Sequence, residues 1–106
     1  LEQLKTIKWR MAKKRQIYKW YHGFEADEGY VPWFIEVVDV NNDKLFKSLT
    51  EKGIGCRKMY PPLHKQKSIN FPVSFPQAEF LAKSILWLPS SLSLTKKEVD
   101  YINAKF

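Results

Sequence analysis

The sequence predicts a small α+β fold, an α/β arrangement in which about four helices pack against a short three-stranded sheet in a two-layer sandwich. Segments with helical spacing alternate along the chain with three short β-branched and aromatic runs, which gives the order helix, strand, helix, strand, helix, strand, helix. The length of 106 residues is that of one domain. Aromatic residues make up 15% of the chain, which favours a packed core over disorder.

Residues 1–24 are predicted to form one helix of about twenty residues. Apolar side chains recur at spacings of three, four and seven and so fall on one face: Leu4, Ile7, Met11, Tyr18 and Tyr21, with Ile17, Trp20 and Phe24 widening the stripe. Gly23 and the acidic turn after it end the helix. Such a helix is long for a domain of this size, so we expect one end to pack on something outside it.

The middle of the chain predicts a strand, a helix and a second strand. The strand within residues 30–40 contains Trp33–Val38, whose aromatic and β-branched composition is typical of a mostly buried strand. After a turn at Asn41–Asp43, a helix is expected over Lys44–Lys52 and ends at Gly53. The second strand covers Ile54–Tyr60, and Pro61-Pro62 ends it because proline cannot donate a ladder hydrogen bond.

The last third predicts a loop, a helix, a strand and a final helix. Lys65–Phe75 has no clear period and is expected to be a loop. Pro76 can begin a helix at its first position, and the apolar run Ile85–Leu88 follows as a short strand. Thr95 and Glu98 have the spacing of a capping box and open the last helix.

The chain is basic, and its charge is concentrated near the start. The net charge is +7, and residues 1–24 hold seven basic residues and one acid: Lys5, Lys8, Arg10, Lys13, Lys14, Arg15, Lys19 and Glu2. A basic helix can bind nucleic acid, an anionic surface or an acidic patch on a partner, or it can present a solvated face.

Several classes of site are excluded by composition and spacing. One cysteine, Cys56, cannot form an internal disulfide, and neither it nor His22 and His64 have metal-ligand spacing. No glycine-rich phosphate loop, membrane span or signal peptide is evident, so a cytoplasmic domain is expected. The first residue is Leu, with no helix cap before it, so we expect the chain to be part of a longer protein.

Three side chains around the Pro-Pro turn are candidate binding groups. Strand alternation places Arg57 on one face, and the rigid turn presents Tyr60 and His64. These groups could hold a phosphate or sugar hydroxyls through charge-assisted hydrogen bonds. Alternatively, Arg57 makes an ordinary ion pair and His64 satisfies a turn carbonyl.

A series of motifs follows in a fixed order along nearly the whole chain. They are Lys13-Lys14-Arg15 through Trp20-Tyr21, Trp33-Phe34-Ile35, Glu51–Ile54, Tyr60–His64, Phe75–Glu79, Leu88-Pro89-Ser90 and Leu94–Phe106. In this order and spacing they resemble the C-terminal small domain of the DegT/DnrJ/EryC1/StrS family of sugar aminotransferases. The resemblance implies a fold like the C-terminal domain of a fold-type I aminotransferase, with residues 1–24 as a linking helix and residues 30–106 as sheet and helices.

The resemblance also implies a function. A perosamine-synthase-like parent would transfer an amino group from an amino acid, usually glutamate, to a nucleotide-linked keto sugar, with pyridoxal phosphate held on a lysine. The missing large domain would hold that lysine, and the parent would be a homodimer. This chain would contribute one wall of the substrate cleft, with Tyr60, His64 and Arg57 as candidate substrate contacts. No catalytic residue, cofactor or metal is expected in this segment, which would be inert alone.

Two non-enzymatic alternatives stay open from the residues. One is a small basic module whose first helix, with Trp9 and Trp20 among its lysines, binds nucleic acid, although these aromatics fall largely on the apolar stripe. The other is a module for association, in which the long helix buries its stripe in a homodimer. Salt-dependent nucleic-acid binding would favour the first, and a concentration-dependent melting temperature the second.

Overall fold

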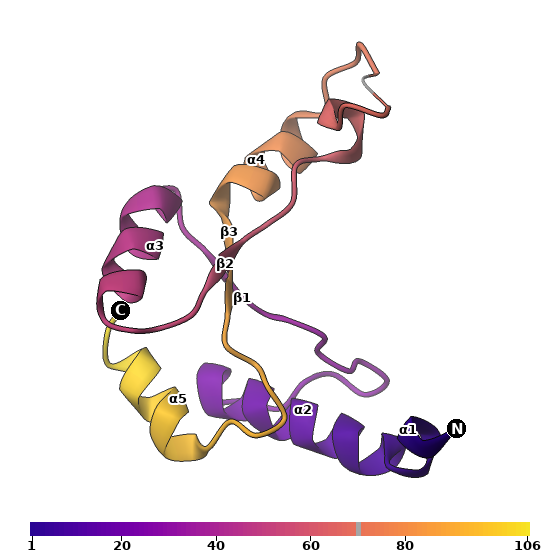
Figure 1. The fold of residues 1–106 in the computed structure, drawn as a ribbon, viewed down its shortest axis with the longest axis vertical. Helices are drawn as coiled ribbons and strands as arrows, with labels where there is room; N and C mark the ends of the chain where they lie inside the picture. Colours follow the sequence, from indigo (N-terminus) through magenta and orange to yellow (C-terminus); the bar gives the residue numbers. More distant parts are fainter. Residues whose placement is uncertain (70) are drawn as a thin grey trace. The chain divides into compact units, whose positions relative to one another are not determined.

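The computed structural model describes residues 1–69 and 71–106 and confirms the predicted α+β class (Figure 1). Its elements are α1 (Glu2–Lys5), α2 (Ile7–His22), β1 (Ile35–Val38), α3 (Asn42–Glu51), β2 (Arg57–Lys58), the 3-10 helix η1 (Leu63–Lys65), α4 (Pro76–Ser84), β3 (Ile85–Leu88) and α5 (Lys96–Asn103). The chain divides into two compact units, residues 36–88 and residues 1–35 with 89–106. Asn70, part of the expected Lys65–Phe75 loop, lies outside the described residues.

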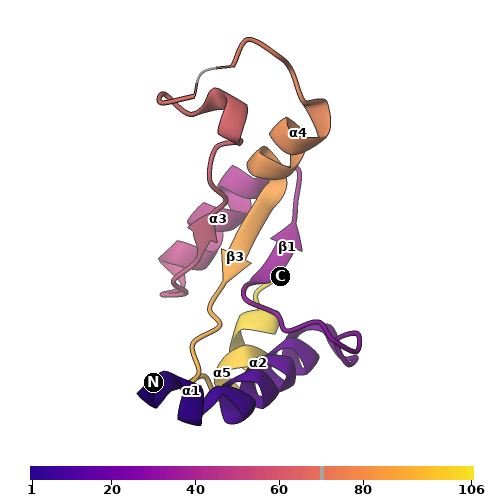
Figure 2. The same cartoon turned by 90° about the vertical axis from the view of Figure 1, so that its right-hand side faces the viewer.

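The unit formed by residues 36–88 is organised around β3. The strand order is β1-β3-β2, and β3 pairs antiparallel with β2 so that Arg57 lies opposite Trp87. All four residues of Ile85–Leu88 are buried, as the apolar run predicts for a central strand. α4 runs directly into β3 without a connecting loop (Figure 2). The predicted helix at Pro76 and the strand after it are both confirmed.

The two outer strands are shorter than predicted. The expected strand over Ile54–Tyr60 is confined to β2, because Ile54 N still donates to Leu49 O at the end of α3, 3.0 Å away. The other strand begins only at Ile35, and its burial alternates instead of being continuous. The prediction of a mostly buried Trp33–Val38 strand is therefore wrong: β1 is an edge strand, and Trp33 before it is 76% exposed.

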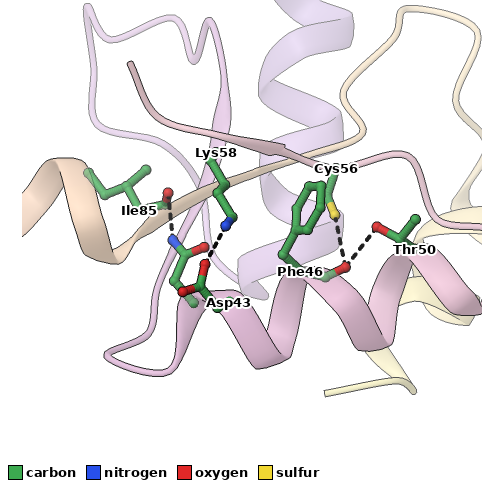
Figure 3. A network of polar contacts seen from close by, with 7 residues as sticks. Asp43, Phe46, Thr50, Cys56, Lys58 and Ile85 are labelled. Atoms are coloured by element: carbon green, nitrogen blue, oxygen red, sulfur yellow. Dashed lines mark hydrogen bonds and ion pairs between the residues drawn. The ribbon is translucent and has the colours of Figure 1, made fainter. Parts of the chain in front are cut away.

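Helix α3 is joined to the sheet by polar contacts at its first turn (Figure 3). The Asn42 Nδ2 donates to the carbonyl of Ile85 at 2.9 Å, and Asp43 forms an ion pair with Lys58 of β2. Leu49 is fully buried on the inner face of the helix. Gly53 has φ +74°, the left-handed conformation that a residue following a helix end commonly adopts and that glycine accepts without strain.

In the other unit, the C-terminal half of α2 packs against α5 (Figure 2). Ile17 of α2 and Val99 and Ile102 of α5 are buried. Asn103 Nδ2 of α5 donates to Trp20 O of α2 at 3.3 Å, and the Tyr21 hydroxyl of α2 donates at 2.9 Å to Pro89 O in the segment that leads to α5. Gly23 ends α2 with φ +79°, which confirms the predicted helix stop.

The single helix predicted over residues 1–24 is wrong in one respect, because Thr6 separates α1 from α2. The Thr6 hydroxyl donates to Gln3 O at 3.2 Å and accepts from Arg10 Nε at 2.9 Å. Such a local side-chain hydrogen bond competes with the helical backbone pattern. The N-terminal part of the predicted apolar stripe is also not core: Leu4, Ile7 and Met11 are exposed.

The capping box at the start of α5 is confirmed and gives a stability prediction. Thr95 Oγ1 accepts from Glu98 N at 3.3 Å, and Thr95 N donates to the Glu98 carboxylate at 2.8 Å. We expect Thr95→Ala to lower the free energy of unfolding by about 1 kcal/mol, measured by urea denaturation. Thr50→Ala is the matched control, because the Thr50 hydroxyl donates back to Phe46 O within α3 and not to a helix end. Equal losses in the two variants would contradict a special role for the cap.

Candidate functional site

The candidate site is built on the turn that follows β2. Met59 N donates to Ile85 O at 3.3 Å as the ladder's last bond, and the two prolines after Tyr60 have no N–H to continue it. Pro62 adopts φ −60° and ψ 149°, and η1 then begins, with Lys65 N donating to Pro62 O at 2.9 Å. The turn therefore holds the side chains before and after it in fixed positions.

Arg57 and Tyr60 meet on one side of this turn. The guanidinium carbon of Arg57 lies 4.8 Å from the centre of the Tyr60 ring, a cation–π distance. The Tyr60 ring in turn lies edge-on to Trp87, with ring centres 5.2 Å apart. Arg57 is exposed and Tyr60 is 51% exposed, so both present polar groups to solvent from a platform that β3 supports.

His64 has a different setting, because it is only 6% exposed. Its Nε2 lies 2.9 Å from Oε1 of Glu79, and its ring packs edge-on against Phe75 at 5.0 Å. Its backbone carbonyl accepts from Phe71 N at 3.0 Å. Among the described residues, the imidazole therefore bonds a side chain of α4 through Nε2.

Glu79 collects several donors at the start of α4. Its Oε1 accepts from Ser74 Oγ at 3.2 Å and from Phe75 N at 3.3 Å, in addition to the His64 contact, and Lys65 Nζ lies 3.7 Å away. The hydrogen bond from His64, followed by those from Phe75 and Ser74, lowers the pKa of Glu79 from the ordinary 4.5 to about 2. Glu79 therefore stays ionised throughout the physiological range.

Tyr60 and His64 line one shallow apolar groove of about 720 Å³ in this unit. The other walls are mainly aromatic and aliphatic: Met59, Pro61, Pro62, Leu63, Gln66, Ile69, Phe71, Phe75, Ala78, Leu81 and Ala82. Arg57 reaches the rim only through its contact with Tyr60 and does not line the groove. The structure thus brings two of the three predicted residues to one groove and places the third beside it.

Within the described residues, no group of three or more His, Cys, Asp or Glu side chains could hold a metal ion, and no helix is long and apolar enough to cross a membrane. Cys56 is half-buried just before β2, with its sulfur 3.9 Å from Phe46 O.

Comparison with known proteins decides the family. The model of the DegT/DnrJ/EryC1/StrS aminotransferase family matches residues 1–106, the whole chain. The chain belongs to the DegT/DnrJ/EryC1/StrS aminotransferase family. No curated protein sequence matches it significantly.

A solved structure supports the fold of this family member. The chain superposes on the aminotransferase TlmJ from Streptoalloteichus hindustanus with a TM-score of 0.79 and 23% identity. The match covers 97% of this chain but 32% of the TlmJ chain, so this chain spans about a third of that protein.

Aminotransferases of this family typically use pyridoxal phosphate, which a lysine holds as a Schiff base. Burial lowers the pKa of Lys14, which is a property of Schiff-base lysines. However, Lys14 Nζ donates to Ser90 O at 2.7 Å, Trp33 O at 3.1 Å and Ser90 Oγ at 3.2 Å. These three acceptors use all three ammonium protons. Lys14 therefore fits a structural anchor and does not fit a cofactor lysine.

Sequence reasoning missed the roles of Glu79 and Lys14. In the sequence Glu79 is the end of the Phe75–Glu79 motif, and its pairing with His64 spans fifteen positions that no local pattern connects. The acceptors of Lys14 are backbone carbonyls and one hydroxyl, which leave no charge pattern in the sequence.

The low pKa of Glu79 predicts a pH-dependent contribution to stability. A carboxyl whose pKa is lower in the folded state stabilises above its unfolded pKa, and this stabilisation is lost as pH falls from about 4.5 to about 2. We expect Glu79→Gln to unfold at lower urea concentration than the wild type at pH 7, with the difference narrowing across that acid range. Glu36→Gln, at an exposed position of β1, is the control. A difference that does not change with pH would contradict the proposed charge effect.

Proposed function

We propose that this chain is the C-terminal small domain of a nucleotide-sugar aminotransferase that depends on pyridoxal phosphate. The parent would move an amino group from an amino-acid donor such as glutamate to a keto sugar carried on a nucleotide. The observation that carries the proposal is the family match over the whole chain. Residues 1–24 would link the two domains, and residues 30–106 would form the small domain itself.

The cofactor would belong to the large domain of the parent. When bound, pyridoxal phosphate supplies an electron sink for the carbon that gains or loses the amino group. Because Lys14 is held by three oxygen acceptors, no lysine role in that chemistry is assigned to it. The chain by itself is proposed to be inactive and to supply one wall of the substrate cleft.

Arg57 and Tyr60 are the proposed substrate contacts. Arg57 offers a planar cation with several donors, which suits the phosphates of a nucleotide sugar. The exposed Tyr60 ring offers a stacking surface and its hydroxyl a hydrogen bond to a sugar hydroxyl. Their mutual contact and the support of Trp87 reduce the motion of both side chains, which lowers the entropy cost of binding.

His64 is proposed to position this surface. Its contact with Glu79 ties the residues after the Pro-Pro turn to the first turns of α4. Since the ring nitrogen Nε2 is engaged with Glu79 and the ring is buried, His64 would act on substrate mainly through the placement of Tyr60 and the groove.

The parent is further proposed to be a cytoplasmic homodimer. The family match favours this enzyme over a basic nucleic-acid-binding module. If the chain bound RNA or DNA at physiological salt, and this binding weakened steeply as salt rose, the nucleic-acid-binding alternative would be favoured instead.

We expect Tyr60→Ala in the longer polypeptide to lower kcat/KM for a nucleotide-linked keto sugar by about tenfold, mostly through KM. Arg57→Ala should act similarly, whereas Tyr60→Phe should retain the ring stacking and lose less. The measurement is steady-state transamination with glutamate as donor, with melting temperatures recorded in parallel.

Tyr101→Ala provides the matched control. Tyr101 on α5 is 50% exposed and also carries a cation over its ring, Lys105 at 4.6 Å. It lies outside the groove of Tyr60 and His64. If the Tyr60 and Tyr101 variants lost the same activity, or if neither lost any, the assignment of Tyr60 to substrate would be wrong.

A further inference from the structure

The contact between His64 and Glu79 decides which nitrogen of the His64 ring carries a proton. A neutral imidazole has one N–H donor and one acceptor nitrogen, and the partner of one nitrogen sets the state of the other. Nε2 of His64 lies 2.9 Å from Oε1 of Glu79. Nδ1 has no hydrogen-bond partner among the described residues. The protonation state of Glu79 therefore determines what Nδ1 can bind.

Glu79 can only accept a hydrogen bond from His64, because its carboxyl group is ionised. Its Oε1 also accepts from Ser74 Oγ at 3.2 Å and from Phe75 N at 3.3 Å, and the Lys65 ammonium lies 3.7 Å away. The His64 contact and these groups lower the pKa of Glu79 to about 2. An ionised carboxylate has no proton to donate, so the hydrogen of the 2.9 Å contact is on Nε2. In the neutral ring, Nδ1 then carries a lone pair.

Packing keeps the His64 ring in this orientation. The residue is only 6% exposed, and its ring lies edge-on to Phe75 with the ring centres 5.0 Å apart. A half-turn of the ring about its bond to Cβ would replace Nε2 by a carbon and would break the contact with Glu79. The lone pair of Nδ1 therefore has a fixed direction.

The groove that His64 lines offers hydrogen-bond acceptors in an otherwise mainly apolar surface. Tyr60, His64 and Gln66 share this groove of about 720 Å³, which we call the His64 groove. Gln66 Nε2 donates to Pro61 O at 3.2 Å, so the amide oxygen of Gln66 is left to accept from a ligand. A fully ionised phosphate or a carboxylate offers acceptors alone and has no match to Nδ1 or to this oxygen. A hydroxyl group supplies the missing donor.

We propose that Glu79 is a positioning residue that holds His64 with Nε2 protonated, so that Nδ1 accepts a hydrogen bond from a substrate hydroxyl in the His64 groove. This inference rests on the proposed function and deepens it, because it assigns the two polar ends of the substrate to different side chains. The phosphates would go to Arg57, which is exposed and does not line the groove. The hydroxyl would come from the keto sugar or from the ribose. His64 would then select against a substrate that lacks this hydroxyl.

The first test reads the tautomer of His64 from the side-chain nitrogen chemical shifts of the 106-residue chain at mildly alkaline pH. A protonated ring nitrogen and one with a lone pair differ widely in chemical shift. We expect Nε2 to be the protonated nitrogen of His64. His22 is the other histidine of the chain and provides an internal reference, because its ring packs against Tyr18 and Phe24 and has no carboxylate partner among the described residues.

Variants of Glu79 test the cause of the tautomer. Glu79→Met removes both acceptor oxygens at about the same side-chain length, and we expect a mixture of the two tautomers of His64. Glu79→Gln keeps one oxygen that can accept from Nε2 and should retain more of the original form. Ser74→Ala is the matched control, because it removes another donor to Oε1 and leaves the His64 contact in place. The tautomer should not change in this control.

The second test compares a nucleotide-linked keto sugar with its deoxy analogues in transamination by the longer polypeptide. Loss of the hydroxyl that meets His64 should lower kcat/KM by about tenfold, the size expected for one hydrogen bond. The Glu79→Met variant should lose most of this preference. Analogues that lack a hydroxyl on the sugar or on the ribose distinguish the two sources. Glu36→Gln, at an exposed position of β1, should keep the full preference.

A proton on Nδ1 of neutral His64, or a ring that stays doubly protonated at alkaline pH, would overturn the inference. A hydroxyl preference that Glu79→Met leaves unchanged, or no preference for any hydroxyl, would also overturn it. The tautomer is measured without substrate and so does not depend on activity. The expected tautomer in a polypeptide that does not transaminate would overturn only the proposed function. Transamination by a protein with the opposite tautomer would overturn only the role of Glu79.

Discussion

The carbonyl of Ile85 is the point on which the unit of residues 36–88 depends. It accepts from Asn42 Nδ2 at the start of α3 and from Met59 N at the end of β2. Both donors come from segments that enclose a strand with no exposed residue, so water cannot replace either bond. The buried carbonyl oxygen of Ile85 therefore fixes the positions of α3, of β2 and of the Pro-Pro turn relative to β3.

The candidate site is supported by β3 through one set of contacts and by α4 through another. The pairing of Arg57 with Trp87 places the cation and the Tyr60 ring on one platform. On the other side, α4 carries Glu79 to His64, which fixes the chain after the turn. The polar groups of the site are thus held by one strand and the helix that leads into it, which is the kind of rigid support that a binding surface needs.

Sequence patterns predicted best where a single local rule decides the structure. The stop at Gly53, the proline start of α4, the capping box at Thr95 and the buried run Ile85–Leu88 all depend on neighbours in the chain. The patterns failed where partners are distant. An apolar stripe predicts a face but not what covers it, and Met11 on that face is exposed in the structure. Arg57, Tyr60 and His64 were found as a set, but only the structure separates the buried histidine from the two exposed groups.

The direct passage from α4 into β3 has an evolutionary consequence. Ser84 is the last helical residue and Ile85 the first of the strand, so no loop exists to absorb a change in length. One inserted residue would rotate α4 by about 100° relative to the strand, or would turn every side chain of β3 to the opposite face. The junction of α4 and β3 should therefore tolerate neither insertions nor deletions. The turn around Glu25–Gly29, in contrast, is exposed at nearly every position and can vary in length.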